Sequence, residues 1–191
     1  MRVVAGSLRG RIVKAVPGTG TRPTSDRVRE AMFASLGGEI EGARVLDLFA
    51  GSGALGIEAL SRGAAWASFV ESDRAAAGVI RSNLAQLGLA GLGRVHQARA
   101  EALVSKACRE PFDLAFLDPP YATPLGFTSA LLDRLLRRGW LREGALVVLE
   151  GSARREGPSW PEGLTLLWSR RYGDTALHFA RVTEILAGAS P

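Results

Sequence analysis

Asp118, Pro119, Pro120 and Tyr121 follow one another at the end of the apolar run 112–117 and combine a carboxylate, two prolines and an aromatic ring. Prolines cannot continue a strand, because they lack a backbone donor and fix φ. The four residues therefore form a rigid corner at the carboxyl end of a predicted strand, where open α/β sheets bind ligands. A carboxylate beside two carbonyl groups with no competing N–H, followed by an aromatic face, suits a planar base that carries an amino group. The corner indicates chemistry on nitrogen.

A glycine-rich loop between a predicted strand and a predicted helix is the second motif that can do chemistry. Gly51, Gly53 and Gly56 have the spacing of a dinucleotide-binding fingerprint. Glu71 follows Gly51 by 20 residues, where an acid that binds ribose is expected. Taken alone, the loop fits a nicotinamide cofactor or another adenosine cofactor.

Three features favour S-adenosylmethionine over a nicotinamide cofactor. Asp47, inside the strand end, is a poor neighbour for a pyrophosphate but a good one for ammonium and sulfonium charges. The chain ends in two predicted strands with no helix between them, which is not the usual end of a nicotinamide-binding sheet. The corner at 118–121 supplies a place for a nucleophile, which dinucleotide binding does not require.

From residue 43 onward, strand and helix patterns alternate, which predicts an α/β fold with a parallel sheet. Strands are expected at 44–48, 67–71, 94–98, 112–117 and 145–150, and helices at 54–62, 74–86, 101–108 and 125–138. The last two segments, 164–172 and 176–186, are expected to form an antiparallel hairpin. Residues 2–16 predict a small β-hairpin and 26–36 a helix capped by Thr24 or Ser25. We expect residues 1–38 to form an extension and 39–191 the main domain.

The net charge of +5 is confined to the start of the chain. Residues 1–38 carry seven basic and two acidic side chains, whereas residues 39–191 carry 17 of each. This localisation favours an arm that faces a polyanion such as RNA. The side chains expected to contact RNA are those of Arg2, Arg9, Arg11, Lys14, Arg22, Arg27 and Arg29.

Several function classes are excluded or disfavoured by the sequence. Cys108 is the only cysteine, so the chain can form neither an internal disulfide nor a cysteine-based zinc site. His96 and His178 lack metal-ligand spacing, and no metal is expected. No apolar run approaches the roughly 18 residues of a membrane helix, and the N-terminus lacks a signal-peptide core. We expect a cytoplasmic protein with no membrane partner, and a monomer because no amphipathic stretch is left over.

The motifs together resemble a known family. Asp47-Leu-Phe-Ala-Gly51-Ser-Gly53 with Asp118-Pro-Pro-Tyr121 resembles class I methyltransferases that modify exocyclic amino groups. Arg2-Val-Val-Ala-Gly6-Ser-Leu-Arg-Gly10-Arg11 and Thr21-Arg-Pro-Thr-Ser-Asp26-Arg-Val-Arg-Glu30 narrow the resemblance to the bacterial RsmD family. It covers essentially the whole chain. It implies a seven-stranded Rossmann-like sheet, S-adenosylmethionine as cofactor, and methylation of a guanine N2 amine in 16S rRNA, within the 30S subunit or an assembly intermediate.

The resemblance also implies roles for individual residues. Asp47, Gly51 and Gly53 would line the methionine end of the cofactor, in one loop with Ala50 and Ser52. Glu71 would bind the ribose hydroxyls, and Ser72 would lie near the adenine. Arg99 and Ala100 stand where an Asp or Asn commonly meets the adenine amine, so that the backbone at Arg99 would have to accept. Asp118 and the Pro119 carbonyl would hold the target amine, and Tyr121 would stack on the flipped base.

Other interpretations remain open at this point. The corner serves adenine-N6 DNA methyltransferases equally well, although no segment is long enough for a separate target-recognition region. A nicotinamide dehydrogenase is a more distant possibility. From another class, the chain can be a non-catalytic RNA-binding assembly factor on a methyltransferase scaffold, although the intact corner argues against this.

Overall fold

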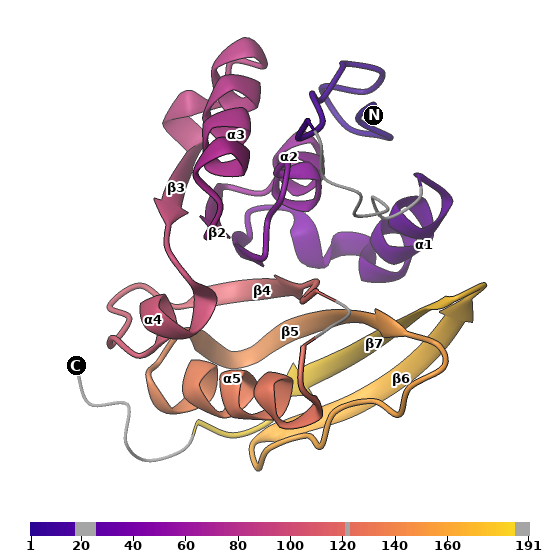
Figure 1. Ribbon diagram of the computed structural model, residues 1–191, viewed down its shortest axis with the longest axis vertical. Coiled ribbons are helices and arrows are strands. Elements are labelled where there is room, and N and C mark those ends of the chain that lie inside the picture. The colour runs from indigo at the N-terminus through magenta and orange to yellow at the C-terminus, as the bar shows by residue number, and fades with distance from the viewer. Residues whose placement is uncertain (18–25, 121–122, 186–191) are drawn as a thin grey trace. The chain divides into compact units, whose positions relative to one another are not determined.

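Strands and helices alternate from residue 44 in the computed structural model, which describes residues 1–17, 26–120 and 123–185. Seven strands form a mixed sheet, and the predicted α/β class is confirmed. The chain divides into two compact units, Met1–Ala98 with three of the strands and Arg99–Pro191 with four (Figure 1). The sequence-based division after residue 38 stays a prediction.

The first unit is a parallel three-stranded sheet with its crossover helices. β1 (Arg44–Leu48), β2 (Trp66–Glu71) and β3 (Gly93–Gln97) lie in the order β3-β2-β1, joined by α2 (Ala54–Ser61) and α3 (Arg74–Gln86). Val45, Leu46 and Phe69 are fully buried, as near-continuous apolar strands require. Helix α1 (Asp26–Leu36) precedes β1, and two short 3₁₀ turns are at Gly37–Ile40 and Ala90–Leu92. The predicted capping residues Thr24 and Ser25 lie outside the described residues.

The second unit carries a mixed four-stranded sheet. Its elements are α4 (Ala100–Val104), β4 (Phe112–Leu117), α5 (Leu125–Arg137), β5 (Leu141–Ser152), β6 (Leu164–Tyr172) and β7 (Thr175–Val182). β4 and β5 are parallel, whereas β7 is antiparallel to both β5 and β6. The turn between β6 and β7 passes through Gly173 at φ 61, a conformation that glycine adopts without strain. The predicted closing hairpin is confirmed.

Three element boundaries differ from the sequence prediction by several residues, and one of them is the end of β7, which lies at Val182 instead of residue 186. Helix α4 ends at Val104 instead of Cys108. The Cys108 N–H donates to the carbonyl of Arg138, just after α5, at 2.9 Å. It therefore does not make the hydrogen bond that would continue α4. Strand β5 begins at Leu141 instead of Ala145, because Leu141 already pairs with Phe112 of β4. The register then shifts before Leu114 pairs with Leu146, and Gly144 at φ 78 lies in this irregular part of β5.

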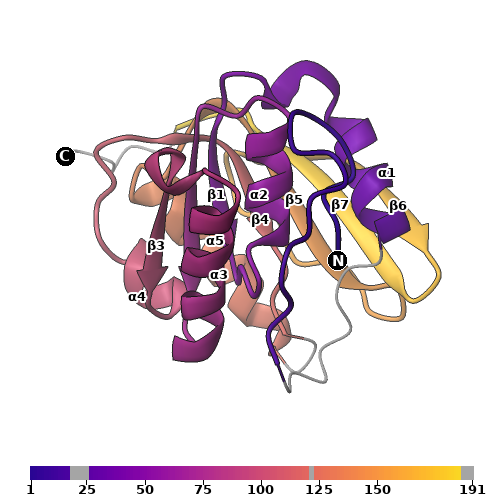
Figure 2. The same cartoon turned by 90° about the horizontal axis from the view of Figure 1, so that it is seen from above.

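The N-terminal residues form the predicted hairpin, but with much less strand pairing than expected. One isolated antiparallel bridge joins Arg2 to Ile12, and the Val3 N–H donates to the Arg11 carbonyl at 3.0 Å. Figure 2 shows this segment running beside α2 and α3. No helix in the described ranges is long and apolar enough to cross a membrane.

Candidate functional site

The glycine loop leaves β1 through backbone that few residues adopt. Phe49, Gly51 and Gly53 have φ values of 64, 55 and 81. A positive φ at a residue other than glycine, as at Phe49, stores strain and is found mainly at functional sites. Apart from the two residues next to it in the chain, no described residue has an atom within 4 Å of a Cβ built on Gly51. The loop therefore offers open backbone to a ligand on that side.

Gly56, the third glycine of the motif, has a packing role. A Cβ at this position would lie 2.3 Å from Cε1 of Phe69, which is fully buried in β2. The missing side chain lets α2 approach the sheet closely, which is the role of the last glycine in this fingerprint.

Glu71, the acid expected from its spacing to bind ribose, lies against the glycine loop. Its Oε2 accepts the Gly51 N–H at 2.8 Å, and its Oε1 accepts the Asp73 N–H at 2.8 Å. The side chain is half-buried, and Ser72 beside it is exposed. A carboxylate has about four acceptor positions, so Glu71 retains capacity for ligand hydroxyls.

Asp47 is enclosed behind the loop. The residue is 1% exposed, and its Oδ2 accepts the Gly56 N–H at 2.9 Å. Burial raises the pKa of this carboxyl to about 7; the Gly56 N–H opposes the rise and the nearby Glu71 charge adds to it. The carboxylate thus fixes the start of α2, and its contact with a cofactor stays a prediction.

We expect the free energy of unfolding to depend on pH through Asp47. Because its folded-state pKa is raised, its contribution to stability is complete below about pH 4 and is lost as pH rises through about 7. Urea denaturation at several pH values between 4.5 and 8 should show this decline. Asp47→Asn should flatten it, and an equally steep decline in the variant would contradict the assignment.

The Asp118 corner directly follows β4, as predicted. Asp118 and Pro119 are half-buried and Pro120 is exposed. The Pro120 carbonyl accepts the Thr123 N–H at 2.8 Å, whereas no donor in the described part of the chain reaches the Pro119 carbonyl. The corner thus presents a carboxylate and an available carbonyl side by side. Tyr121 lies outside the described residues.

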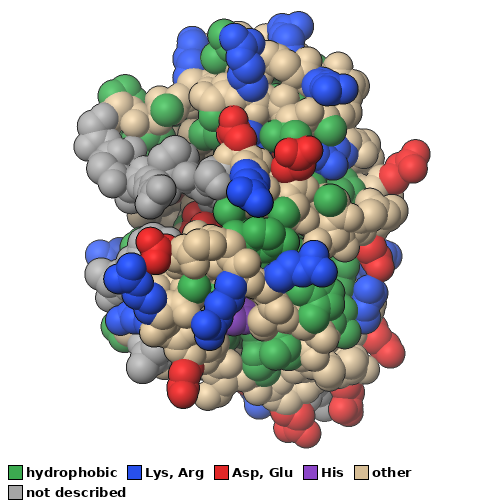
Figure 3. Space-filling model, turned by 90° about the vertical axis from the view of Figure 1, so that its right-hand side faces the viewer, with side chains coloured by type: hydrophobic (Ala, Val, Ile, Leu, Met, Phe, Trp, Pro, Cys, Tyr) green, Lys and Arg blue, Asp and Glu red, His purple; other side chains and the backbone are tan. Residues whose placement is uncertain are grey.

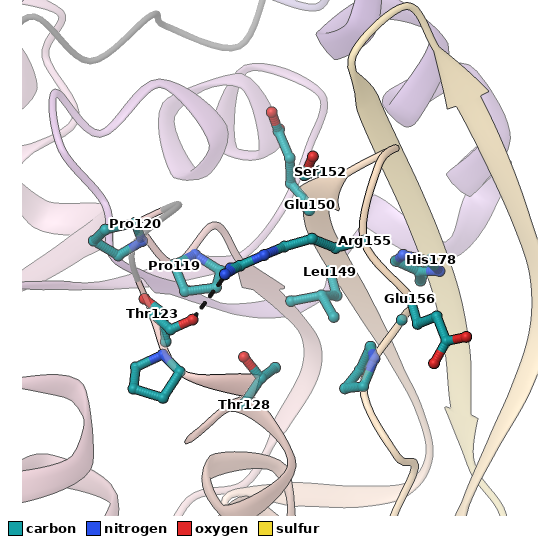
Figure 4. Close-up of a pocket in the computed structure, with 14 residues that line it drawn as sticks. Pro119, Pro120, Thr123, Thr128, Leu149, Glu150, Ser152, Arg155, Glu156 and His178 are labelled. Atoms are coloured by element: carbon teal, nitrogen blue, oxygen red, sulfur yellow. Dashed lines mark hydrogen bonds between the residues drawn. The ribbon is translucent and has the colours of Figure 1, made fainter. Parts of the chain in front are cut away.

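A pocket opens beside this corner within the second unit (Figure 4). The Arg155 side chain crosses from the loop after β5, and its Nη1 donates to the Thr123 carbonyl at 3.3 Å. His178 forms part of the wall, with its Nδ1 2.8 Å from Ser169 Oγ. Burial lowers the pKa of His178, so its imidazole is neutral at pH 7.

Glu150 is a pocket residue that the sequence analysis did not assign. It is 7% exposed at the end of β5 and lines the pocket with Pro119 and Ser152. The available signal was a carboxylate ending the otherwise apolar run 145–149.

The N-terminal arm, residues 1–17, is held by a buried carboxylate on α2. Glu58 is 1% exposed, and its two oxygens accept the N–H groups of Val4 at 2.7 Å and Ala5 at 3.0 Å. Arg62 Nε also donates to it at 2.8 Å. One turn along the helix, the Ser61 hydroxyl accepts the Leu8 N–H at 3.0 Å. The arm is therefore an integral part of the first unit.

Asn83 on α3 joins the arm to the glycine loop. It is fully buried, its Oδ1 accepts the Lys14 N–H at 3.0 Å, and its Nδ2 donates to the Lys14 and Ser52 carbonyls at 3.1 and 3.0 Å. Sequence reasoning missed Asn83 and Glu58 because polar residues on helices usually face solvent.

The prediction that Arg29 contacts RNA is wrong. Arg29 is 1% exposed, and its Nη2 donates to the Arg2 carbonyl and to Asp26 at 3.0 Å, while its Nε lies 3.9 Å from Glu58. The guanidinium is enclosed by the arm that it stabilises. The other predicted cations that the structure describes are exposed: Arg2, Arg9, Arg11, Lys14 and Arg27. Arg22 lies outside the described residues.

The remaining predicted site residues begin the second unit. Arg99 is exposed at the start of α4, 4.0 Å from Glu101, and Ala100 is buried. Their predicted contact with an adenine stays a prediction. In the described ranges, no group of three or more His, Cys, Asp or Glu side chains is placed to hold a metal ion.

Comparisons with known proteins cover almost the whole chain. A family model described as "Conserved hypothetical protein 95" matches residues 1–181. YlbH of Bacillus subtilis is 43% identical over 93% of this chain and 96% of its own length. Ribosomal RNA small subunit methyltransferase D of Escherichia coli K12 is 38% identical over 92% of this chain and 87% of its own. The solved structure of yhhF from Escherichia coli has a TM-score of 0.85 at 37% identity and covers 96% of this chain and 98% of that one.

Proposed function

Since the chain belongs to the conserved hypothetical protein 95 family, the RsmD family, we propose that it transfers a methyl group from S-adenosylmethionine to the N2 amine of a guanine in 16S rRNA. The observation that carries the proposal is the corner after β4. There the Asp118 carboxylate stands next to the Pro119 carbonyl, which no donor in the described part of the chain reaches. This pair matches the two hydrogens of an amino group.

The glycine loop fits the methyl donor. Gly51 leaves the backbone accessible, and Glu71, held by the Gly51 N–H, has acceptor positions for ribose hydroxyls. Asp47 would hold the loop and place a carboxylate near the ammonium end. S-adenosylmethionine, when bound, supplies an electrophilic methyl group on a sulfonium sulfur.

Orientation is the main catalytic contribution of the corner. The N2 lone pair of guanine is delocalised into the ring and is a poor nucleophile. When Asp118 and the Pro119 carbonyl each accept one N2 hydrogen, the lone pair is directed out of the ring plane. The new N–C bond forms as the C–S bond breaks, and sulfur keeps the electron pair. The N2 proton then leaves to Asp118 or to water.

RNA as the carrier of the base is supported by the relatives and by the arm. The Escherichia coli relative is named for ribosomal RNA of the small subunit. Arg9, Arg11 and Lys14 are exposed on the arm. In Figure 3, basic side chains gather at the top of the face shown, and basic and acidic side chains are interspersed below them. Tyr121, outside the described residues, would stack on the flipped base.

Methyl incorporation from labelled S-adenosylmethionine tests the proposal. Free 16S rRNA, 30S subunits and duplex DNA should be compared as acceptors, because DNA labelling would favour the adenine alternative. S-adenosylmethionine should raise the melting temperature and NAD should not. Labelling of DNA alone, or no labelling of any acceptor, would contradict the proposed function.

We expect the arm to set the salt dependence of RNA binding. Replacing Arg9 and Arg11 by glutamine should reduce the slope of log K against log salt by about 1–2, because each phosphate contact contributes about 0.7–0.9. Fluorescence anisotropy with labelled rRNA between 50 and 200 mM salt, roughly the range over which such contacts weaken, measures this slope. Exchanging Arg134 and Arg138, exposed on the second unit, for glutamine is the matched control. An unchanged slope in the arm variant would count against an RNA-facing arm.

A further inference from the structure

The part of the arm around Lys14 is held by one side chain of α3. The Val13 N–H donates to the Met1 carbonyl at 3.0 Å, so the hairpin pairs with itself as far as this residue. At the next residue the partner is Asn83, which accepts the Lys14 N–H at 3.0 Å and donates to the Lys14 carbonyl at 3.1 Å (Figure 2). A carboxamide that pairs with both backbone groups of one residue takes the place of a neighbouring strand. The exposed cation Lys14 is therefore positioned from α3.

The same carboxamide also reaches the glycine loop. Its Nδ2 donates to the Ser52 carbonyl at 3.0 Å, directly after Gly51, where the loop is open to a ligand. Asn83 is fully buried, and only one orientation of its amide satisfies these contacts. Exchanging its oxygen and nitrogen would set the oxygen against two carbonyls and the NH₂ group against the Lys14 N–H. One side-chain conformation thus fixes a point of the arm and a point of the loop.

Release of the arm from Asn83 would affect the loop as well. With Lys14 withdrawn, the carboxamide would keep one of its three hydrogen bonds, and a buried amide with unpaired polar atoms is costly. The amide would turn toward water, and the Ser52 carbonyl would lose the donor that directs it. The docked arm and the ordered loop therefore belong to the same state of Asn83. A ligand that binds either segment in this state stabilises the other segment.

We propose that Asn83 is a positioning residue that couples RNA binding on the arm to cofactor binding in the glycine loop, so that each ligand tightens the binding of the other. The proposal rests on the proposed function, in which the arm contacts RNA and the loop holds S-adenosylmethionine. Methyl transfer needs both substrates at once, and this coupling favours the complex that contains both. Glu58 and Ser61 hold the arm at residues 4–8 from α2, and they provide the comparison.

Amide hydrogen exchange of the wild-type protein tests the link in the absence of RNA. The probe is S-adenosylhomocysteine, which lacks the transferable methyl group. At saturation it should slow exchange of the Lys14 N–H by about fivefold or more, because an occupied loop keeps Asn83 in its docked conformation. The N–H groups of Val4 and Ala5, held by Glu58, are the internal control and should change by less than about twofold. No slowing at Lys14, or equal slowing at all three groups, would contradict the link.

RNA affinity with and without saturating S-adenosylhomocysteine tests the coupling itself. Fluorescence anisotropy with labelled rRNA should show the wild-type Kd falling by about fivefold or more when the probe is added. Asn83→Asp sets a carboxylate against the Lys14 and Ser52 carbonyls, and Asn83→Leu has the same branched shape without polar atoms. In both variants the ratio of the two Kd values should fall below about twofold. Ser61→Ala removes the acceptor of the Leu8 N–H but leaves the contacts of Asn83, and should keep the wild-type ratio.

The outcomes separate the coupling from the proposed function. Melting temperatures show whether the variants fold, and hydrogen exchange of the wild-type protein decides the matter if the Asn83 variants do not. If the probe changes wild-type RNA affinity by less than about twofold, or if folded Asn83 variants keep the wild-type ratio, the coupling is overturned. Neither result touches the proposed function, which methyl incorporation decides. A wild-type protein that binds neither S-adenosylhomocysteine nor rRNA overturns both.

Discussion

Replacing Asp118 by alanine is expected to reduce methyl transfer to rRNA by at least about 100-fold, while S-adenosylmethionine binds as before. The carboxylate follows β4 next to the Pro119 carbonyl, and the glycine loop belongs to a different part of the chain. Removing the carboxylate leaves one N2 hydrogen without an acceptor, and the lone pair is no longer held in line. A positioned acceptor of this kind typically contributes about 10²–10⁴-fold.

Single-turnover rates with saturating RNA, together with the Kd for S-adenosylmethionine, separate the two expectations for Asp118→Ala. Asp118→Asn keeps one acceptor oxygen and should retain an intermediate rate. Glu162→Ala removes an exposed carboxylate from the same unit and serves as the control. Wild-type turnover by Asp118→Ala would contradict a role of the Asp118 carboxylate in methyl transfer.

The second large effect is expected at Glu58, where alanine should destabilise the first unit by about 3–5 kcal/mol. The substitution leaves the N–H groups of Val4 and Ala5 without their acceptor and removes the charge beside the buried Arg29. Losing one partner of a buried ion pair typically has an effect of this size, because the remaining charge is uncompensated.

Urea denaturation of Glu58→Ala measures that loss, and limited proteolysis shows whether the arm is released first. Glu30→Ala on α1 removes an exposed carboxylate and should change the free energy of unfolding by about 0.5 kcal/mol or less. If Glu58→Ala is as stable as this control, the carboxylate does not hold the arm.

The sequence was most informative at prolines and glycines, because each of these residue types is compatible with few backbone environments. Two consecutive prolines after an apolar run located the end of β4, and glycine spacing located the loop between β1 and α2. The 20-residue interval from Gly51 to Glu71 indicated an acid that binds ribose, and this role stays a prediction; the structure places the Glu71 carboxylate 2.8 Å from the Gly51 N–H. Periodicity also predicted the α/β order and the closing hairpin.

The sequence was least informative about polar and charged residues that are buried, because such residues usually face solvent. Arg29 belongs to a cluster of cations in sequence, but its guanidinium is enclosed because Glu58 and the Arg2 carbonyl surround it. Asn83 and Glu150 are partners or pocket residues only through contacts between segments far apart in the chain. Such contacts leave no local periodic signal, so a single sequence does not reveal them.

Identification of the methylated nucleoside tests the central claim most directly. Small-subunit rRNA labelled by the purified protein and S-adenosylmethionine is digested to nucleosides and analysed by mass spectrometry. The proposed function predicts N2-methylguanosine at a single position, with no label in Asp118→Ala reactions. N6-methyladenosine as the product, or no methylated nucleoside at all, would contradict it.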